Sequence, residues 1–177
     1  MYHNISKNRP TELEKIQSLN NGFAYELTVV INVVDLYNNF TFYDKTEALM
    51  VANMFIDVIA VHARVLLEFF RDGKSQDDDD VRANDFMKVG ETWTAPDIDN
   101  DAKYTHLKQV KERINKEVTH LTYDRVRHTK SSWKFTPILV ELFDITHSFI
   151  SKCDEKYIEK PLLNTINYGE RILKLDK

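Results

Sequence analysis

The sequence predicts an all-α protein: a four-helix up-and-down bundle with a short C-terminal helix and a long loop between helices 2 and 3. The 177 residues include only four glycines and four prolines, fewer than a turn-rich β architecture needs. Long stretches carry apolar residues three and four positions apart, which is the helical repeat. With 42% hydrophobic and 29% charged residues, the chain has a globular composition, and we expect one domain over residues 1–177.

The first helix is expected to begin near Thr11, after Pro10, and to run to about Asn38 with a break at residues 20–22. Its second half is rich in β-branched residues, but the apolar run is too long for one strand and does not alternate strictly. Helix is therefore the prediction for this stretch. Residues 1–9, which precede the helix, are predicted to be disordered.

The second helix is expected to start at Asp44 or Thr46 and to end near residues 72–73. Its polar residues form one narrow stripe on an otherwise apolar cylinder: Asn53, Asp57, Arg64, Glu68 and Arg71. This pattern predicts a helix at the centre of the bundle. Because polar residues interrupt its apolar run, no membrane span is predicted here. His62, on the apolar side, is expected to be a core residue with satisfied hydrogen bonds.

Residues 74–100 are predicted to form a long acidic loop, and loops of that length in compact domains are usually functional. Between Asp77 and Asp101, nine acidic residues face two basic ones, a net charge of −7. Between Lys103 and Lys134, nine basic residues face three acidic ones, a net charge of +6. Such asymmetry is typical of a site for an anionic partner, but charged solvated faces are equally common. Trp93 and Trp133 are expected to anchor loops, and either could instead stack on a base.

The third helix is predicted over about residues 102–123, with an apolar stripe of Leu107, Val110, Ile114, Val118 and Leu121. The fourth is predicted to open with Thr136 as its cap and Pro137 in its first turn, and to continue to about Tyr157. Pro161 is expected to break the chain before the short C-terminal helix, which spans about residues 162–175.

The single cysteine, Cys153, cannot form an internal disulfide, and the N-terminal stretch has no apolar segment of the secretory kind. These features predict a cytoplasmic protein. The net charge of −4 argues against a surface coated uniformly for nucleic acid. There is no Gly-rich phosphate loop, cysteine-based metal motif or nucleophile elbow, so no cofactor and no metal site is predicted.

Arg113 and His120 are the most informative pair. Seven residues are close to two helical turns, so both side chains share one face, separated by roughly 10 Å along the axis. Both lie on the flank of the buried stripe, with Glu117 between them. Histidine can transfer a proton near neutral pH, and arginine can hold a phosphate through two hydrogen bonds. The pair could activate a ribose 2′-hydroxyl and stabilise charge on the adjacent phosphate without a metal ion.

An Arg followed after four to six residues by a His, placed late in an all-α bundle, resembles the signature of the HEPN superfamily. The segments "HARVLLEFFRDG", "DDVRANDF" and "RINKEVTHLTYDR" are also similar to bacterial proteins near that superfamily, and the likeness covers about residues 45–130. Many members are metal-independent endoribonucleases of defence and toxin–antitoxin systems, in which two protomers line one cleft. The resemblance therefore implies a homodimer that acts on RNA, and a protein partner such as an antitoxin.

By this resemblance, Arg113 is the phosphate-binding residue and His120 the proton-transfer residue. Lys116, Arg125 and Arg127 are expected to guide the RNA backbone, where such cations position the ligand without reading its sequence. Arg64 and Glu68 share a face of the second helix; they are expected either to pair across the bundle or to support Arg113 and His120. The chain departs from the family pattern at Ile114, where ribonuclease members often carry a polar residue.

Three other interpretations remain open at this point. Arg113 and Glu117 could form an ordinary surface pair contributing about 0.3 kcal/mol. The fold could serve as a non-catalytic binding or interaction module. The Glu-x-x-His at 117–120 and the Asp-x-x-His at 144–147 could form a di-metal carboxylate site, although they fall on consecutive helices rather than on the second and fourth.

Overall fold

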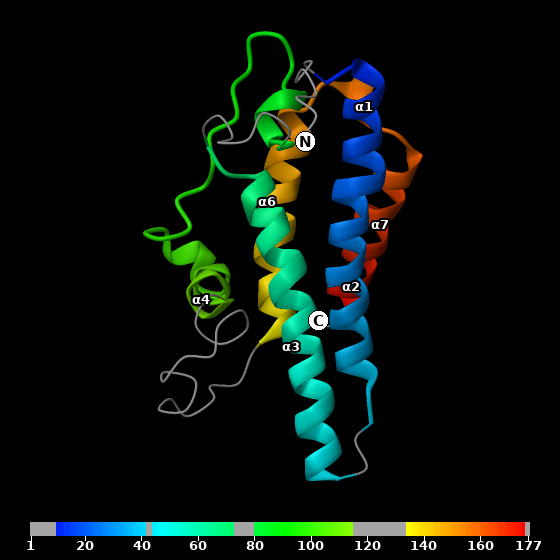
Figure 1. Cartoon of the computed structure of the whole chain (residues 1–177), viewed down its shortest axis with the longest axis vertical. Coiled ribbons are helices and arrows are strands. Elements are labelled where there is room, and N and C mark those ends of the chain that lie inside the picture. The colour runs from blue at the N-terminus through cyan, green and yellow to red at the C-terminus, as the bar shows by residue number, and fades with distance from the viewer. Residues whose placement is uncertain (1–9, 42–43, 73–79, 115–133, 176–177) are drawn as a thin grey trace, which may run out of the picture.

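The computed structural model describes residues 10–41, 44–72, 80–114 and 134–175 (Figure 1). Within these ranges the chain is helical and contains no strand, which confirms the all-α class. The α-helices are α1 (Glu12–Gln17), α2 (Ala24–Asn39), α3 (Lys45–Phe69), α4 (Thr105–Arg113), α6 (Phe135–Lys152) and α7 (Lys160–Leu175). A π-helical segment, Ser18–Phe23, joins α1 to α2, and short 3-10 turns occur at Ala83–Phe86, Ala102–Tyr104 and Glu155–Tyr157.

The first helix begins where the sequence predicts. Thr11 and Glu14 form a reciprocal capping box, in which Thr11 Oγ1 accepts from the Glu14 amide at 3.2 Å and Glu14 Oε2 accepts from the Thr11 amide at 2.7 Å. The regular α-helix is interrupted around the possible break predicted at residues 20–22, but by a π-helical segment that carries the chain into α2 rather than by a loop. Buried Asn20 fixes this segment by donating to the carbonyls of Ile16 and Tyr157, both at 2.8 Å.

The start of α3 agrees with the prediction, and Asp44 caps the helix by accepting hydrogen bonds from the amides of Thr46 and Glu47. The central position predicted for this helix holds only for its second half, which carries all of its buried residues among those described. In the first half, Met50 and Met54 are 63% and 65% exposed. Figure 1 shows the first turns of α3 extending past α6 and α7, with α2 alongside.

By length and composition alone, α3 could also cross a membrane, and it is the only helix among the described residues that could. The core helices of soluble proteins often pass the same test.

The C-terminal helix differs most from the prediction. With 16 residues, α7 is as long as α2, against which it packs. Pro161 does not break it but lies in its first turn, where the missing amide proton removes no helical hydrogen bond. Gly169 allows α7 to pack closely, because a Cβ at this position would collide with the ring of Phe143 and a methyl group of Ile31.

The start and end of α6 also differ from the prediction. The helix begins at Phe135, and Thr136 does not cap it; the Thr136 hydroxyl instead accepts from the side-chain amide of Asn38 at 3.1 Å. Pro137 lies in the first turn as expected. The helix ends at Lys152, before Tyr157, because the backbone becomes extended at Cys153. The Cys153 thiol is buried, and burial raises its pKa to about 12.

Aromatic rings from four segments meet around Phe149 of α6, whose side chain is fully buried. Its ring centroid lies within 5.2–6.3 Å of the rings of Phe23, Phe69, Phe70, Phe86 and Trp93. These residues come from the π-helical segment, the end of α3 and the loop that follows it. The ring cluster therefore holds that loop against the helices.

In its described part, the segment between α3 and α4 contains the predicted loop. Trp93 anchors this loop, as predicted. The indole N–H of Trp93 donates to the Phe70 carbonyl at 2.7 Å, and Asp72 accepts from the Ala95 amide at 2.7 Å. Trp133 and residues 1–9 lie outside the described residues. The anchored loop leads directly into the turn that precedes α4.

The described part of the third predicted helix is α4, which is seen nearly end-on in Figure 1 and so crosses the long helices. Its N-terminus is held by Glu141 of α6, which is 8% exposed. The Glu141 carboxylate accepts from the amides of His106 and Leu107 at 3.1 and 2.8 Å and lies 2.6 Å from His106 Nδ1. Leu107, Val110 and Ile114 are buried, which confirms the described part of the apolar stripe.

Replacement of Phe149 by alanine is expected to lower the free energy of unfolding by about 3–5 kcal/mol, because it leaves a cavity among five rings. Urea denaturation followed by circular dichroism measures the change. Val89→Ala is the control: Val89 is fully exposed at 102%, and its replacement should change stability by less than about 0.5 kcal/mol. Equal effects of the two substitutions would contradict a central role for this ring.

Candidate functional site

The structure describes three of the residues predicted to form the site. Arg64 and Glu68 lie on successive turns of α3, and half-buried Arg113 is the last residue of α4. The other predicted site residues, Lys116, Glu117, His120, Arg125 and Arg127, lie outside the described residues. The pairing of Arg113 with His120, or with Glu117, therefore stays a prediction.

Arg64 and Glu68 line a depression of 290 Å³ where the ends of α3 and α4 meet. We call it the basic depression; its charged residues are Arg64, Glu68, Arg71 and Lys111. The loop residues Ala95, Pro96 and Ile98 form one wall, and Ile114, the residue after Arg113, lies at the other side. The structure thus places both supporting residues beside the end of the helix that carries Arg113.

Three of the four charged groups in the basic depression are cations. Arg71 and Lys111 are well exposed, with 69% and 53% of their side chains accessible. The Lys111 ammonium lies 2.6 Å from the carboxylate of Asp99, and its hydrogen bond lowers the pKa of that acid. An anion that enters the depression would therefore meet an excess of positive charge from two helices.

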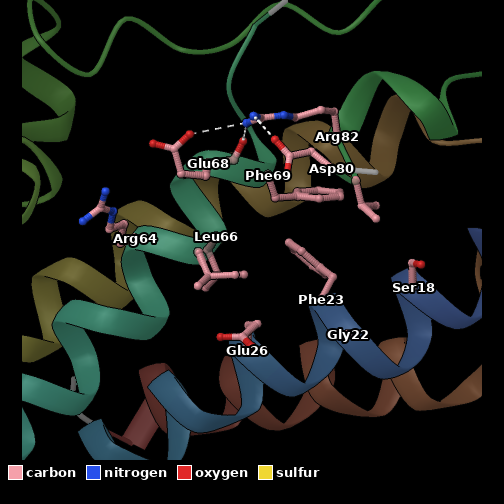
Figure 2. Close-up of a pocket in the computed structure, with 12 residues that line it drawn as sticks. Ser18, Gly22, Phe23, Glu26, Arg64, Leu66, Glu68, Phe69, Asp80 and Arg82 are labelled. Atoms are coloured by element: carbon pink, nitrogen blue, oxygen red, sulfur yellow. Dashed lines mark hydrogen bonds and ion pairs between the residues drawn. The ribbon is translucent and has the colours of Figure 1, made fainter. Parts of the chain in front are cut away.

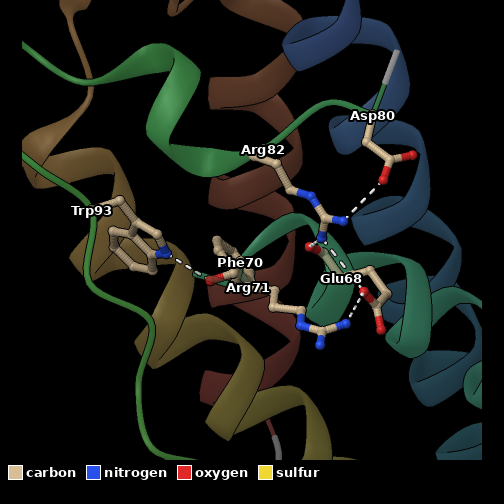
Figure 3. Close-up of polar contacts among 6 residues, drawn as sticks. All are labelled: Glu68, Phe70, Arg71, Asp80, Arg82 and Trp93. Atoms are coloured by element: carbon tan, nitrogen blue, oxygen red, sulfur yellow. Dashed lines mark hydrogen bonds and ion pairs between the residues drawn. The ribbon is translucent and has the colours of Figure 1, made fainter. Parts of the chain in front are cut away.

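Glu68 contacts two arginines, Arg71 and Arg82 (Figure 3). Its Oε2 lies 3.5 Å from Nη1 of Arg71 and 3.4 Å from Nη1 of Arg82. Arg82 also donates to the backbone carbonyl of Glu68, one of the last carbonyls of α3, and to Asp80 Oδ2 at 2.9 Å. This arrangement fixes the carboxylate at the edge of the depression.

Arg82 is the residue that sequence reasoning missed. Its side chain is only 15% exposed, and its buried Nε finds no hydrogen-bond partner among the described residues. The available signal was a lone arginine directly after a run of acids, "DDDDVR", since a cation in that position is well placed to hold a helix C-terminus. Its long-range partner on α3 could not be read from the sequence.

Within the described residues, no group of three or more His, Cys, Asp or Glu side chains could hold a metal ion. Of the two motifs considered for a di-metal site, the one at 117–120 lies outside these residues. In the other, Asp144 accepts from the Tyr104 hydroxyl at 2.8 Å and lies 2.6 Å from the Lys103 ammonium. Burial opposes ionisation of Asp144, but these two hydrogen bonds hold its pKa below the ordinary value.

These observations place the described part of the candidate site at the joint between α3 and α4. The sequence matches no protein-family model, and neither the curated proteins nor the solved structures contain a match for it.

Arg82→Ala is expected to lower the free energy of unfolding by about 1.5–3 kcal/mol, because it removes charged hydrogen bonds to a helix carbonyl and to two carboxylates. Arg71→Ala is the matched control; this exposed arginine contacts the same carboxylate, and its loss should cost less than about 1 kcal/mol. Thermal or urea unfolding measures both variants. A larger effect of Arg71→Ala would show that Arg82 does not hold the loop.

Proposed function

We propose that the protein binds RNA at the basic depression and cleaves it without a metal ion, as a ribonuclease of the bacterial defence or toxin–antitoxin type. One observation carries this proposal: Arg64 of α3, Arg71 just after α3 and Lys111 of α4 line one depression together with Ile114, the residue that follows Arg113. Cationic side chains that neutralise phosphates supply most of the affinity of proteins for nucleic acids. In this proposal the protein is cytoplasmic, and a protein of the antitoxin kind is its expected partner.

In the proposed reaction, His120 removes the proton from a ribose 2′-hydroxyl, and the 2′-oxygen attacks the adjacent phosphorus. The bond to the 5′-oxygen breaks, that oxygen takes a proton from water, and a 2′,3′-cyclic phosphate remains; the imidazolium of His120 returns its proton to the solvent. Arg113 stabilises the negative charge that develops on the phosphate oxygens. Lys116, Arg125 and Arg127 hold the neighbouring phosphates, and Glu117, Arg64 and Glu68 orient the two reacting side chains.

The proposal also includes a homodimer, formed with a second copy of the chain. Met50, Met54, Val61 and Val65 of α3 are 45–65% exposed, and their spacing sets them within about 60° of one another around the helix. The stripe is about 22 Å long. Exposed apolar faces of this kind are typical of interfaces, and a twofold axis would pair the face with itself.

The second candidate is a non-catalytic RNA-binding or interaction module of the same fold. Ile114 favours it: ribonuclease members of the resembled superfamily often carry a polar residue at this position, whereas Ile114 is 2% exposed and belongs to the core. The two candidates share the basic depression and differ only in the chemistry of Arg113 and His120.

Arg71→Glu and Lys111→Glu are each expected to weaken binding of a fluorescent single-stranded RNA at least about tenfold, because each replaces a phosphate-binding cation by an anion. Fluorescence anisotropy at two salt concentrations measures the affinity and its salt dependence. Lys160→Glu, an equal charge change on an exposed residue of α7, is the control and should bind like wild type.

Cleavage is measured on the same RNA in EDTA. Wild type should cut it, and His120→Ala should bind but not cut. Binding without cutting by wild type would select the non-catalytic module. Equal binding by Lys160→Glu, Arg71→Glu and Lys111→Glu would reject the basic depression as the RNA site.

Light scattering after size-exclusion chromatography is expected to give twice the 20.8 kDa mass for wild type and one protomer for Met54→Lys. A lysine at this position would place a charge within the apolar stripe. Leu163→Lys, on the 44% exposed Leu163 of α7, should leave the mass doubled. A wild-type mass of one protomer at high micromolar concentration would reject the homodimer.

A further inference from the structure

A second cavity, of 490 Å³, lies between the helices on the other side of the end of α3 (Figure 2). Its volume falls within the range of about 300–1,000 Å³ that is usual for small-molecule sites. Most of its lining is apolar and comes from three segments: Gly22 and Phe23 of the π-helical segment, Val65, Leu66 and Phe69 of α3, and Val81 of the loop. The cavity therefore fits an apolar body.

Contacts with neighbouring residues do not explain why position 22 holds a glycine. Glycine inside a helix costs about 1 kcal/mol relative to alanine. Gly169 has a structural reason, since a Cβ there would collide with Phe143, but a Cβ on Gly22 would meet no described atom within 4 Å. Gly22 also lines the cavity. No close approach of the described chain therefore requires a glycine at this position of the cavity wall.

The backbone around Gly22 is also unusual. It belongs to the π-helical segment Ser18–Phe23, and π-helical turns inside α-helices occur frequently at functional sites. The segment is held in place by Asn20, whose side chain bonds the carbonyls of Ile16 and Tyr157 and the amide of Glu159. One wall of the cavity is therefore a π-helical turn whose position is fixed by the hydrogen bonds of Asn20.

Three acidic residues, Glu26, Glu68 and Asp80, and two arginines, Arg64 and Arg82, line the cavity. Figure 2 shows Phe23 and Glu26 projecting towards α3, while the Arg64 guanidinium points away from them. Arg82 is already contacted by the carboxylates of Glu68 and Asp80. Glu26, with 22% of its side chain exposed, lies 2.6 Å through Oε2 from His62 Nδ1. His62 is thus half-buried rather than in the core as predicted, but its hydrogen bond is satisfied.

We propose that this cavity binds a small organic amine whose apolar body lies between Phe23, Leu66 and Phe69 and whose ammonium group faces the carboxylate of Glu26. An apolar body gains from leaving water, and a half-buried carboxylate favours a cation over an anion of the same shape. The cavity shares Arg64 and Glu68 with the basic depression but lies on the other side of the end of α3, and its further carboxylates, Glu26 and Asp80, disfavour an anion.

The test compares three probes that share one apolar body and differ in charge: 4-phenylbutylamine, 4-phenylbutanol and 4-phenylbutyrate. Isothermal titration calorimetry with wild type, without RNA, should give the amine at least tenfold tighter binding than the carboxylate. Equal binding of all three probes, or tightest binding of the carboxylate, would overturn the assignment of charge. No binding of the amine would overturn the site.

Two glycine variants test the location. Gly22→Leu should abolish amine binding because its side chain enters the cavity, whereas Gly22→Ala should bind and should unfold at a slightly higher temperature than wild type. Undiminished binding by Gly22→Leu would place the ligand elsewhere. Glu26→Gln should bind the amine no more tightly than the alcohol; an unchanged preference would show that Glu26 does not face the ammonium group.

Discussion

The packing of aromatic rings around Phe149 is the constraint on which the rest of the structure depends. It joins the π-helical segment, the end of α3 and the following loop to α6. Because Phe86 and Trp93 fix the loop there, Arg82 reaches the last carbonyls of α3 from a defined direction. Both cavities border this joint, so their shape is a consequence of ring packing in the core.

The end of α3 separates two cavities that differ in charge. Arg64 and Glu68 line both; the basic depression adds Arg71 and Lys111, whereas the larger cavity adds Glu26, Asp80 and Arg82. Glu68 is the common element, since its carboxylate contacts Arg71 on one side and Arg82 on the other. The position of this carboxylate is therefore set by groups on both sides of the end of α3.

Features that depend on neighbouring residues were predictable from the sequence, and features that depend on distant segments were not. Thr11 and Asp44 cap their helices through hydrogen bonds within three residues, so the pattern was sufficient. Thr136 was mistaken for a cap because its partner, Asn38, is 98 positions away. The site followed the same rule: Arg64 and Glu68 were found from helical spacing, whereas Arg82 depends on a partner 14 residues away, and Gly22 depends on the space around it.

Ile114 shows how closely the chemistry of the candidate site is tied to the core. It follows Arg113 directly, is 2% exposed, and lies on the same buried stripe as Leu107 and Val110. A polar side chain at position 114 would be buried without a hydrogen-bond partner, which costs about 1–3 kcal/mol. The packing of α4 thus excludes the additional polar group that ribonuclease members of the resembled superfamily often carry. In the proposed reaction Arg113 and His120 therefore act without that group, and the basic depression beside Ile114 supplies the further contacts to phosphate.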